Sequence, residues 1–340
     1  MFRVYATMDQ RLAPGAVAEH ARRAEALGYD GLLVPEAVHD GLVAATLALH
    51  ATQRIRVQTS VLVAFPRSPM AVAVAAWDLQ ALSGGRFELG LGPQVRGNIE
   101  GRYSTRWTPP VPRMREYVNA LRAIFAHWQE RTPLRFEGEH YRFTRMQPFF
   151  DPGALASGAP PILLGAVGPG MTALVGEVAD GMVTHPTNTH PRYVREVIRP
   201  RLEQGAARAG RDAARLRLCL APLCATGATR EEVAAEREGR RELLAFLYST
   251  PAYWPSLELF GWRERGEALH RMTREGRWKE LRDAIDDAML DCFVPTGLYR
   301  ELPAILRAWY GGLTDWLTFP MPADPRRDPE VARALAELRA

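Results

Sequence analysis

A histidine and two carboxylates follow one another near the start of the chain. Glu36, His39 and Asp40 come directly after the apolar run GLLVP at 31–35. An imidazole titrates close to neutral pH, and a neighbouring carboxylate can raise its pKa into the range useful for proton transfer. His39 is therefore a candidate to give or take a substrate proton. Glu36, at the end of a buried run, is a candidate to orient or bind a ligand, although both residues also suit an ordinary polar surface.

A glycine-rich turn further along the chain has the features of an anion site. GAVGPG at 165–170 joins an apolar run to a helical pattern that begins at Pro169. The first N–H groups of a helix have no partners within it, and the helix dipole adds positive charge there, so an anion is favoured. A tight turn that binds no ligand would contain the same types of residue.

Two further segments carry polar groups after apolar runs. GLGPQVRGN at 90–98 offers Gln94 and Arg96, and a fixed guanidinium such as Arg96 suits an acidic ligand. His185 follows the run GMVT at 181–184. Side chains of these types in loops often face only water, so each segment is a candidate whose value depends on where the fold places it.

The elements that must position these residues alternate between strand-like and helical patterns. Such alternation predicts a parallel sheet, and four β-α units in the first hundred residues favour an α/β fold of the (β/α)8 TIM-barrel type. The expected strands are Phe2–Thr7, Gly31–Pro35, Ile55–Ala64, Phe87–Leu91, Pro161–Ala166, Gly181–Thr184, Leu216–Thr226 and Asp315–Phe319. In such a barrel the loops after the strands meet at one mouth, so all the candidates above are expected there.

Three segments interrupt this pattern. Gly92–Pro112 is too long for a plain connection, and Arg135–Met146 alternates like a hairpin with Gly138 near its turn. Helical patterns from about 234 to 295 predict an insertion before the last strand, within a single domain that spans 1–340. Its aromatic residues suit a lid or pocket wall for an apolar substrate, or a core or dimer contact. They are Phe246, Tyr248, Tyr253, Trp254, Phe260 and Trp262.

Composition narrows the possible partners. The 340 residues carry 43 basic and 39 acidic side chains, spread along the chain, so no basic stripe points to a nucleic acid. No apolar run is long enough to span a bilayer, and no signal peptide begins the chain. Cys219, Cys224 and Cys292 lack metal-ligand spacing, and Cys219 and Cys224 are interpreted as buried thiols on opposite faces of one strand. These features favour a reducing cytoplasm.

The segments around the expected mouth resemble the luciferase-like monooxygenase superfamily, particularly its branch that uses the deazaflavin coenzyme F-420. The resemblance rests on four segments in the same order and spacing along the first two thirds of the chain. They are GYDGLLVPE at 28–36, TSVLVAFPRSP at 59–69, LSGGRFELGLG at 82–92 and GAVGPGMTALVGEVADG at 165–181.

The resemblance implies where a cofactor would bind. In this branch a cis peptide in the third strand bulges against the cofactor ring, and the Ser60-Val61 step occupies the matching position. Asn98 matches a residue that bonds the polar edge of the flavin, with Gln94 and Arg96 as neighbours. The turn at the fifth strand resembles the clamp for the cofactor phosphate. Its residues are Ala166, Val167, Gly168, Pro169 and Gly170.

The sequence departs from the superfamily pattern at the proton-transfer group. Most relatives place an acidic residue directly before a histidine at the end of the second strand, whereas Ala37 follows Glu36 here and the imidazole arrives at His39. A catalytic histidine therefore cannot be transferred directly from the family. His39 with Glu36 remains the preferred catalytic pair.

The sequence thus predicts an F-420-dependent oxidoreductase that moves a hydride between the deazaflavin and a small organic substrate. The nearest alternative is an FMN-dependent monooxygenase of the same fold, supplied with reduced flavin by a partner reductase. A non-catalytic flavin-binding protein and a metal-dependent hydrolase are further alternatives, the latter with few ligands beyond Glu36, His39, Asp40 and His185. No metal is expected, and the resemblance suggests a homodimer.

Overall fold

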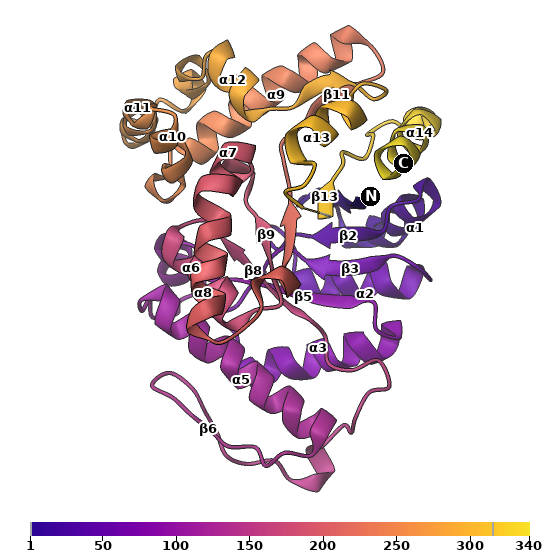
Figure 1. The fold of residues 1–340 in the computed structure, drawn as a ribbon, viewed down its shortest axis with the longest axis vertical. Coiled ribbons are helices and arrows are strands. Elements are labelled where there is room, and N and C mark those ends of the chain that lie inside the picture. The colour runs from indigo at the N-terminus through magenta and orange to yellow at the C-terminus, as the bar shows by residue number, and fades with distance from the viewer. Residues whose placement is uncertain (1, 315) are drawn as a thin grey trace.

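Eight parallel strand positions close into a barrel in the computed structural model, which describes residues 2–314 and 316–340. The ring runs β1, β2, β3 with β4, β5, β8, β9, β10 and β13, and the pairing of β3 with β5 and of β13 with β1 closes it. Their bounds are β1 Arg3–Thr7, β2 Gly31–Val34, β3 Arg56–Thr59, β4 Leu62–Val63, β5 Phe87–Gly92, β8 Ile162–Ala166, β9 Gly181–Thr184, β10 Arg217–Leu220 and β13 Trp316–Thr318. The predicted (β/α)8 barrel is confirmed (Figure 1).

The third strand position is divided into two pieces. β3 pairs with β2 and β5, and β4 continues the same position with Leu62 opposite Leu91. Between them the Ser60-Val61 peptide bond is cis, as the resemblance led us to expect. The expected single strand Ile55–Ala64 is therefore interrupted at the residues that face the mouth.

Helices cover the outside of the barrel, and local sequence signals start several of them. Asp40 caps α2 by accepting from the N–H groups of Leu42 and Val43, and Ser68 with Pro69 starts α3. The barrel helices are α1 Val17–Leu27, α2 Gly41–Ala51, α3 Pro69–Ser83, α4 Arg96–Gly101, α5 Pro110–Glu130, α6 Pro169–Val178, α7 Pro191–Tyr193, α8 Arg199–Arg208, α13 Leu302–Tyr310 and α14 Asp328–Arg339.

A buried ion network closes the amino-terminal end of the barrel. Glu88 on β5 is fully buried and accepts hydrogen bonds from Tyr5 Oη at 3.1 Å and Arg217 Nη1 at 2.7 Å. Arg56 Nη1 lies 3.3 Å from the same carboxylate. Because β1 and β10 are not neighbours of β5, these bonds cross the barrel interior. The interior of the barrel is therefore filled by side chains at this end.

The insertion is a helical layer with an apolar core of its own. α9 Arg230–Tyr248, α10 Pro255–Leu259, α11 Arg263–Arg274 and α12 Asp287–Phe293 lie between β11 Ala225–Gly227 and β12 Thr296–Leu298, which pair in parallel. Figure 1 shows these helices in orange at one end of the molecule. Most of the aromatic stretch packs in this core, with Tyr248 fully buried and Phe246 exposed.

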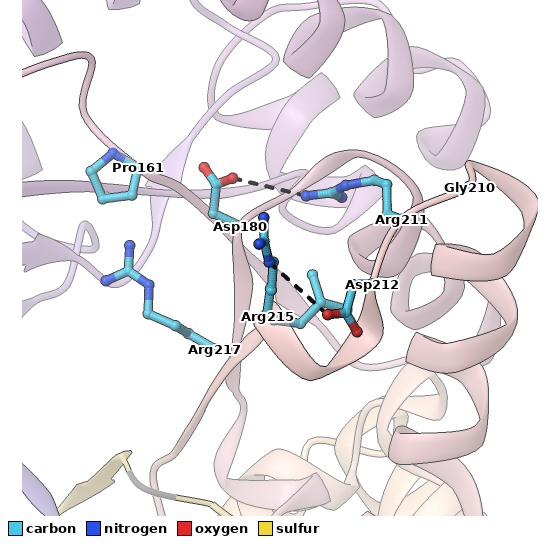
Figure 2. Close-up of a pocket in the computed structure, with 8 residues that line it drawn as sticks. Pro161, Asp180, Gly210, Arg211, Asp212, Arg215 and Arg217 are labelled. Carbon is cyan, nitrogen blue, oxygen red and sulfur yellow. Dashed lines mark ion pairs between the residues drawn. The ribbon is translucent and has the colours of Figure 1, made fainter.

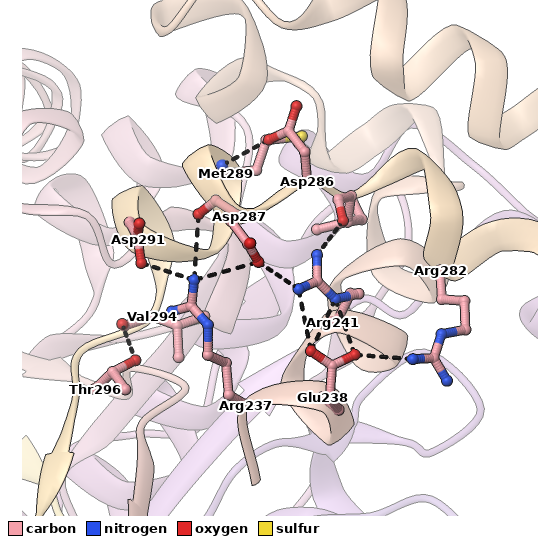
Figure 3. A network of polar contacts seen from close by, with 11 residues as sticks. Arg237, Glu238, Arg241, Arg282, Asp286, Asp287, Met289, Asp291, Val294 and Thr296 are labelled. Atoms are coloured by element: carbon pink, nitrogen blue, oxygen red, sulfur yellow. Dashed lines mark hydrogen bonds and ion pairs between the residues drawn. The ribbon is translucent and has the colours of Figure 1, made fainter. Parts of the chain in front are cut away.

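Salt bridges hold the outer side of the insertion. Arg241 on α9 reaches Asp287 of α12 at 2.6 Å, and Arg282 reaches Glu238 at 2.8 Å. Figure 3 shows these groups with Arg237, which lies 2.7 Å from Asp291. The contacts tie α9 to α12, so the insertion is cross-linked as well as packed.

One predicted strand was wrong. Leu216–Thr226 does not form a single strand: β10 ends at Leu220, and the chain turns before β11 pairs with β12 outside the barrel. Cys219 lies inside the barrel and Cys224 precedes β11, so they are not on opposite faces of one strand. Both are buried thiols, as expected, and burial raises the pKa of each to about 12.

The other predicted elements agree with the structure within a few residues. The expected hairpin forms from β6 Phe136–Glu137 and β7 Arg142–Phe143. Of the eighth strand, Asp315 lies outside the described residues. No helix in the described part of the chain is long and apolar enough to cross a membrane.

We predict that Glu88→Ala lowers the free energy of unfolding by about 3 kcal/mol, because it leaves Arg217 and Arg56 without their buried counter-charge. Glu100→Ala, which removes an exposed pair with Arg96, is the matched control and should leave the free energy of unfolding almost unchanged. Urea unfolding followed by circular dichroism measures both. Equal effects of the two substitutions would show that the buried Glu88 ion network does not stabilise the barrel.

Candidate functional site

The open end of the barrel is centred on the side chain of Val61. A Cβ at Gly92 would lie 2.5 Å from Val61 Cγ2, and a Cβ at Gly165 would lie 2.9 Å from Val61 Cγ1. Glycine on these two strands therefore leaves room for Val61 to reach into the interior, where it contacts the cluster of Tyr5, Leu33, Val183 and Cys219.

Glu36 holds the segment that follows Val61. Its Oε2 accepts from the Val63 N–H at 2.6 Å and from Arg67 Nη1 at 3.0 Å, and its Oε1 accepts from Arg67 Nη2 at 2.6 Å. The Glu36 side chain is 5% exposed. Since both oxygens are engaged, Glu36 is suited to position the third strand rather than to carry a proton. Arg67, which completes this clamp, was not found from the sequence.

His39 lies beside the mouth but is not paired with its neighbouring carboxylate. Asp40 accepts from the first N–H groups of α2 and from Arg67 Nη2 at 2.7 Å, and no bond joins it to His39 in the described chain. The expected Asp40–His39 contact is therefore absent there. His39 instead lines a cavity of about 220 Å³ with apolar neighbours from the segments that follow β1 and β2 and from the start of α1. Among them are Met8, Leu12, Pro14, Val17 and Pro35.

The predicted anion site is formed by the start of α6. Gly168 is the N-cap and supplies no side chain, and Pro169 has no N–H. The N–H groups of Gly170 and Met171 have no recorded acceptor among the described residues. At Gly168 a Cβ would meet no atom within 4 Å and φ is −79°. The fold itself therefore does not require glycine there, and the bare backbone leaves this N-terminus accessible to an anion.

The loop after β5 presents the remaining candidates. Gln94 has a φ of 61°, and its Oε1 accepts from the N–H of Val95. Asn98 lies on the short helix α4, with no side-chain partner recorded in the described chain. Arg96 forms an exposed ion pair with Glu100, in which Nε and Oε2 are 2.9 Å apart. Asn98 is thus free to bind a ligand, whereas the charge of Arg96 is already engaged at the surface.

His185 lies at the opposite side of the ring from His39. It follows β9, which is four positions from β2 in the closed sheet. The ring of Tyr253 from the insertion stacks on it, with centroids 4.3 Å apart and planes 12° apart. Burial lowers the pKa of His185 to about 4. The sequence analysis named His185 as a candidate after one strand and Tyr253 as part of the aromatic stretch of the insertion. The contact between the two residues was found only from the structure.

Two other clusters do not form part of this site. A cavity of about 650 Å³ lies at the amino ends of β8 to β10 (Figure 2). Two of its three cations are engaged: Arg211 binds the carbonyls of Gly176 and Ala179, and Arg217 binds Glu88, whereas Arg215 is exposed and 4.0 Å from Asp212. Glu116, Glu139 and His140 lie together outside the barrel, where the Glu116 carboxylate accepts two backbone N–H groups of the hairpin turn.

Comparison with known families agrees with this geometry. The model of the luciferase-like monooxygenase family matches residues 1–313, which include every strand up to β12 and all the mouth residues described above. The chain belongs to the luciferase-like monooxygenase family. Members of this family are oxidoreductases and monooxygenases, so the chain is an enzyme of that class that uses a deazaflavin or a flavin.

Two curated relatives of this luciferase-like enzyme cover most of its length. An uncharacterized protein of Mycobacterium tuberculosis is 42% identical over 305 residues, 89% of each chain. A 5,10-methylenetetrahydromethanopterin reductase of Archaeoglobus fulgidus is 27% identical over 287 residues, which are 82% of this chain and 81% of the relative.

Solved structures share the barrel of this luciferase-like enzyme. The coenzyme F-420-dependent tetrahydromethanopterin reductase of Methanopyrus kandleri superimposes with a TM-score of 0.80 at 17% identity, covering 99% of this chain and 98% of that one. An EDTA monooxygenase from Chelativorans sp. BNC1 gives a TM-score of 0.72 at 13% identity, covering 98% and 93%. At these identities the likeness concerns the fold.

We predict that Glu36→Ala speeds hydrogen exchange at the Val63 amide, because that N–H loses its carboxylate acceptor. Glu36→Gln, which keeps one oxygen, should have a smaller effect. Mass-spectrometric exchange of the peptide spanning 60–67 measures the change, and the peptide that contains Glu88 serves as the internal control. Exchange at Val63 that is the same in all three proteins would show that Glu36 does not hold this segment.

Proposed function

We propose that this luciferase-like enzyme is a coenzyme F-420-dependent oxidoreductase acting on a small organic substrate. The observation that supports it is the pairing, at one mouth, of the glycine-bordered surface around Val61 with the open N-terminus of α6. A flat ring fits the first and a phosphate fits the second. When bound, the deazaflavin supplies or accepts a hydride at its C5.

The protein's own groups then have separate tasks. Val61, seated between Gly92 and Gly165, would support one face of the ring, and Asn98 would bond its polar edge. The N–H groups of Gly170 and Met171 would hold the phosphate. Glu36 and Arg67 keep the third strand in place from behind. His39 would give a proton to the substrate oxygen when the substrate is reduced, and would take it back when the substrate is oxidised.

An FMN-dependent monooxygenase is the second candidate, and the likeness to the EDTA monooxygenase favours it. The same mouth would accept the FMN ring and phosphate. The two functions differ in cofactor preference and in their need for oxygen. Fluorescence titration of the purified protein with F-420 and with FMN, followed by a spectral screen of carbonyls and alcohols, tests the proposal. Tight binding of FMN alone would overturn it in favour of the monooxygenase.

We predict that Gly168→Val weakens cofactor binding about tenfold without lowering stability. The Cβ branch would cover the N–H groups of Gly170 and Met171, whereas a Cβ at 168 meets no atom of the protein. Gly239→Val, at an exposed and uncrowded position of α9, is the control and should leave binding unchanged. If Gly168→Val binds the cofactor as tightly as the parent, the phosphate does not bind at α6.

We predict that His39→Ala lowers kcat about a hundredfold while the cofactor dissociation constant stays within about twofold. The reason is that His39 lines the cavity beside the mouth and carries a proton, but does not hold the ring. Stopped-flow oxidation of the bound deazaflavin by a substrate from the screen measures the rate. His50→Ala, an exposed histidine of α2, is the matched control. An unchanged rate in His39→Ala would exclude His39 as the proton carrier.

A further inference from the structure

His185 faces the interior at the rim of the barrel. Successive residues of a strand point to opposite sides, so His185 follows Val183 on the inner face. Val183 lies in the interior cluster with Leu33 and Val61. His185 is thus the polar side chain that lies directly above this apolar interior cluster. Its ring is mostly buried, yet it borders the mouth across from His39.

The hydrogen bonds of His185 favour one position for its proton. The N–H of Thr187 donates to Nδ1 at 3.4 Å, and the Thr187 hydroxyl lies 2.8 Å from the same atom. Because a backbone N–H can only donate, Nδ1 is assigned as the acceptor and the proton of the neutral ring to Nε2. Burial is the cause that lowers the pKa of this imidazole to about 4, and no charged group contributes. The ring is therefore uncharged at neutral pH, in an uncharged environment.

The insertion holds this ring in its orientation. Tyr253 stacks on it from η6, Pro251–Tyr253. The neighbouring Trp254 donates to the carbonyl of Tyr248, and the Tyr248 hydroxyl lies 3.4 Å from the carbonyl of Thr187. Ring stacking and hydrogen bonds thus join the segment around Tyr253 to the loop after β9. A stacked, buried ring loses little entropy when it binds a ligand.

We propose that His185 is the substrate-binding group opposite His39: its Nε2–H donates a hydrogen bond to an uncharged oxygen of the substrate, and Tyr253 is the positioning residue that holds it. This rests on the proposed function. The substrate is then a neutral ketone or alcohol with an apolar remainder that packs against the ring of Tyr253. A carboxylate or sulfonate beside these two rings would lose its hydration and gain only a neutral imidazole, so anionic substrates are disfavoured.

The state of the ring is tested without turnover. Protein labelled with nitrogen-15 in histidine is examined by long-range imidazole correlation between about pH 5.5 and pH 8.5, and the signal lost in His185→Gln assigns the ring. We expect a neutral pattern with the proton on Nε2 that does not titrate over this range. A ring protonated on Nδ1, or one that becomes charged near its usual pKa, would overturn the proposal.

The binding role is tested on the F-420-loaded enzyme with methyl butyl ketone and cyclohexanone, and with the terminal carboxylate analogue of the open-chain ketone. We expect His185→Ala to raise KM for the ketones about tenfold with little change in kcat, and His185→Gln to recover most of the loss. Tyr253→Ala should raise KM as well. Trp278→Ala, at an exposed aromatic residue of the insertion, is the control. The carboxylate should be a poor substrate.

Three outcomes separate the possibilities. If the parent does not bind the deazaflavin, the proposed function fails. If it binds the cofactor but the His185 and Tyr253 variants lose that binding, their role is in holding the cofactor and the inference is overturned. If the loaded parent neither binds nor reduces any neutral ketone, or prefers the carboxylate, the substrate class is wrong.

Discussion

The Glu36 carboxylate stabilises the mouth on which every functional argument depends. It binds the Val63 N–H and the Arg67 guanidinium from a nearly buried position, so the chain after Val61 stays in the sheet as β4. A buried carboxylate is costly unless all its acceptor sites are used, and here both oxygens are engaged. The consequence is a fixed Val61 at the top of the barrel. A carboxylate at the end of a barrel strand can therefore serve the site through position alone, and the proton transfer proposed here is assigned to His39.

The two ends of the barrel are built for different purposes. At the amino end, bonds from Glu88 to Tyr5 and Arg217 cross the interior and fill it with paired charge. At the carboxyl end, glycine takes the place of side chains on two strands, and the interior ends in an apolar surface. The polar candidate residues lie around this surface and not within it. That arrangement suits a deazaflavin or flavin ring, because the protein has to contribute support and orientation while the cofactor supplies the redox chemistry.

Much of this architecture could be predicted from local sequence, because short apolar runs alternate with helical patterns and end in glycine or proline. Prediction from local sequence fails where contacts between residues far apart in the chain determine the structure. Leu216–Thr226 is mostly apolar, and although Pro222 could mark a break, its local sequence does not show that the second half pairs with β12. Asp40 is adjacent to His39 in sequence, yet its oxygens go to α2 and to Arg67. The stacking of Tyr253 on His185 joins residues of two separate layers, and periodicity carries no information about such contacts.

A crystal structure of the protein with bound F-420 tests the central claim most directly. The account predicts the deazaflavin ring over Val61 between the strands of Gly92 and Gly165, with its phosphate at the N–H groups of Gly170 and Met171. Density for the ring at any other place, such as the cavity beside Arg211 at the closed end of the barrel, would contradict it.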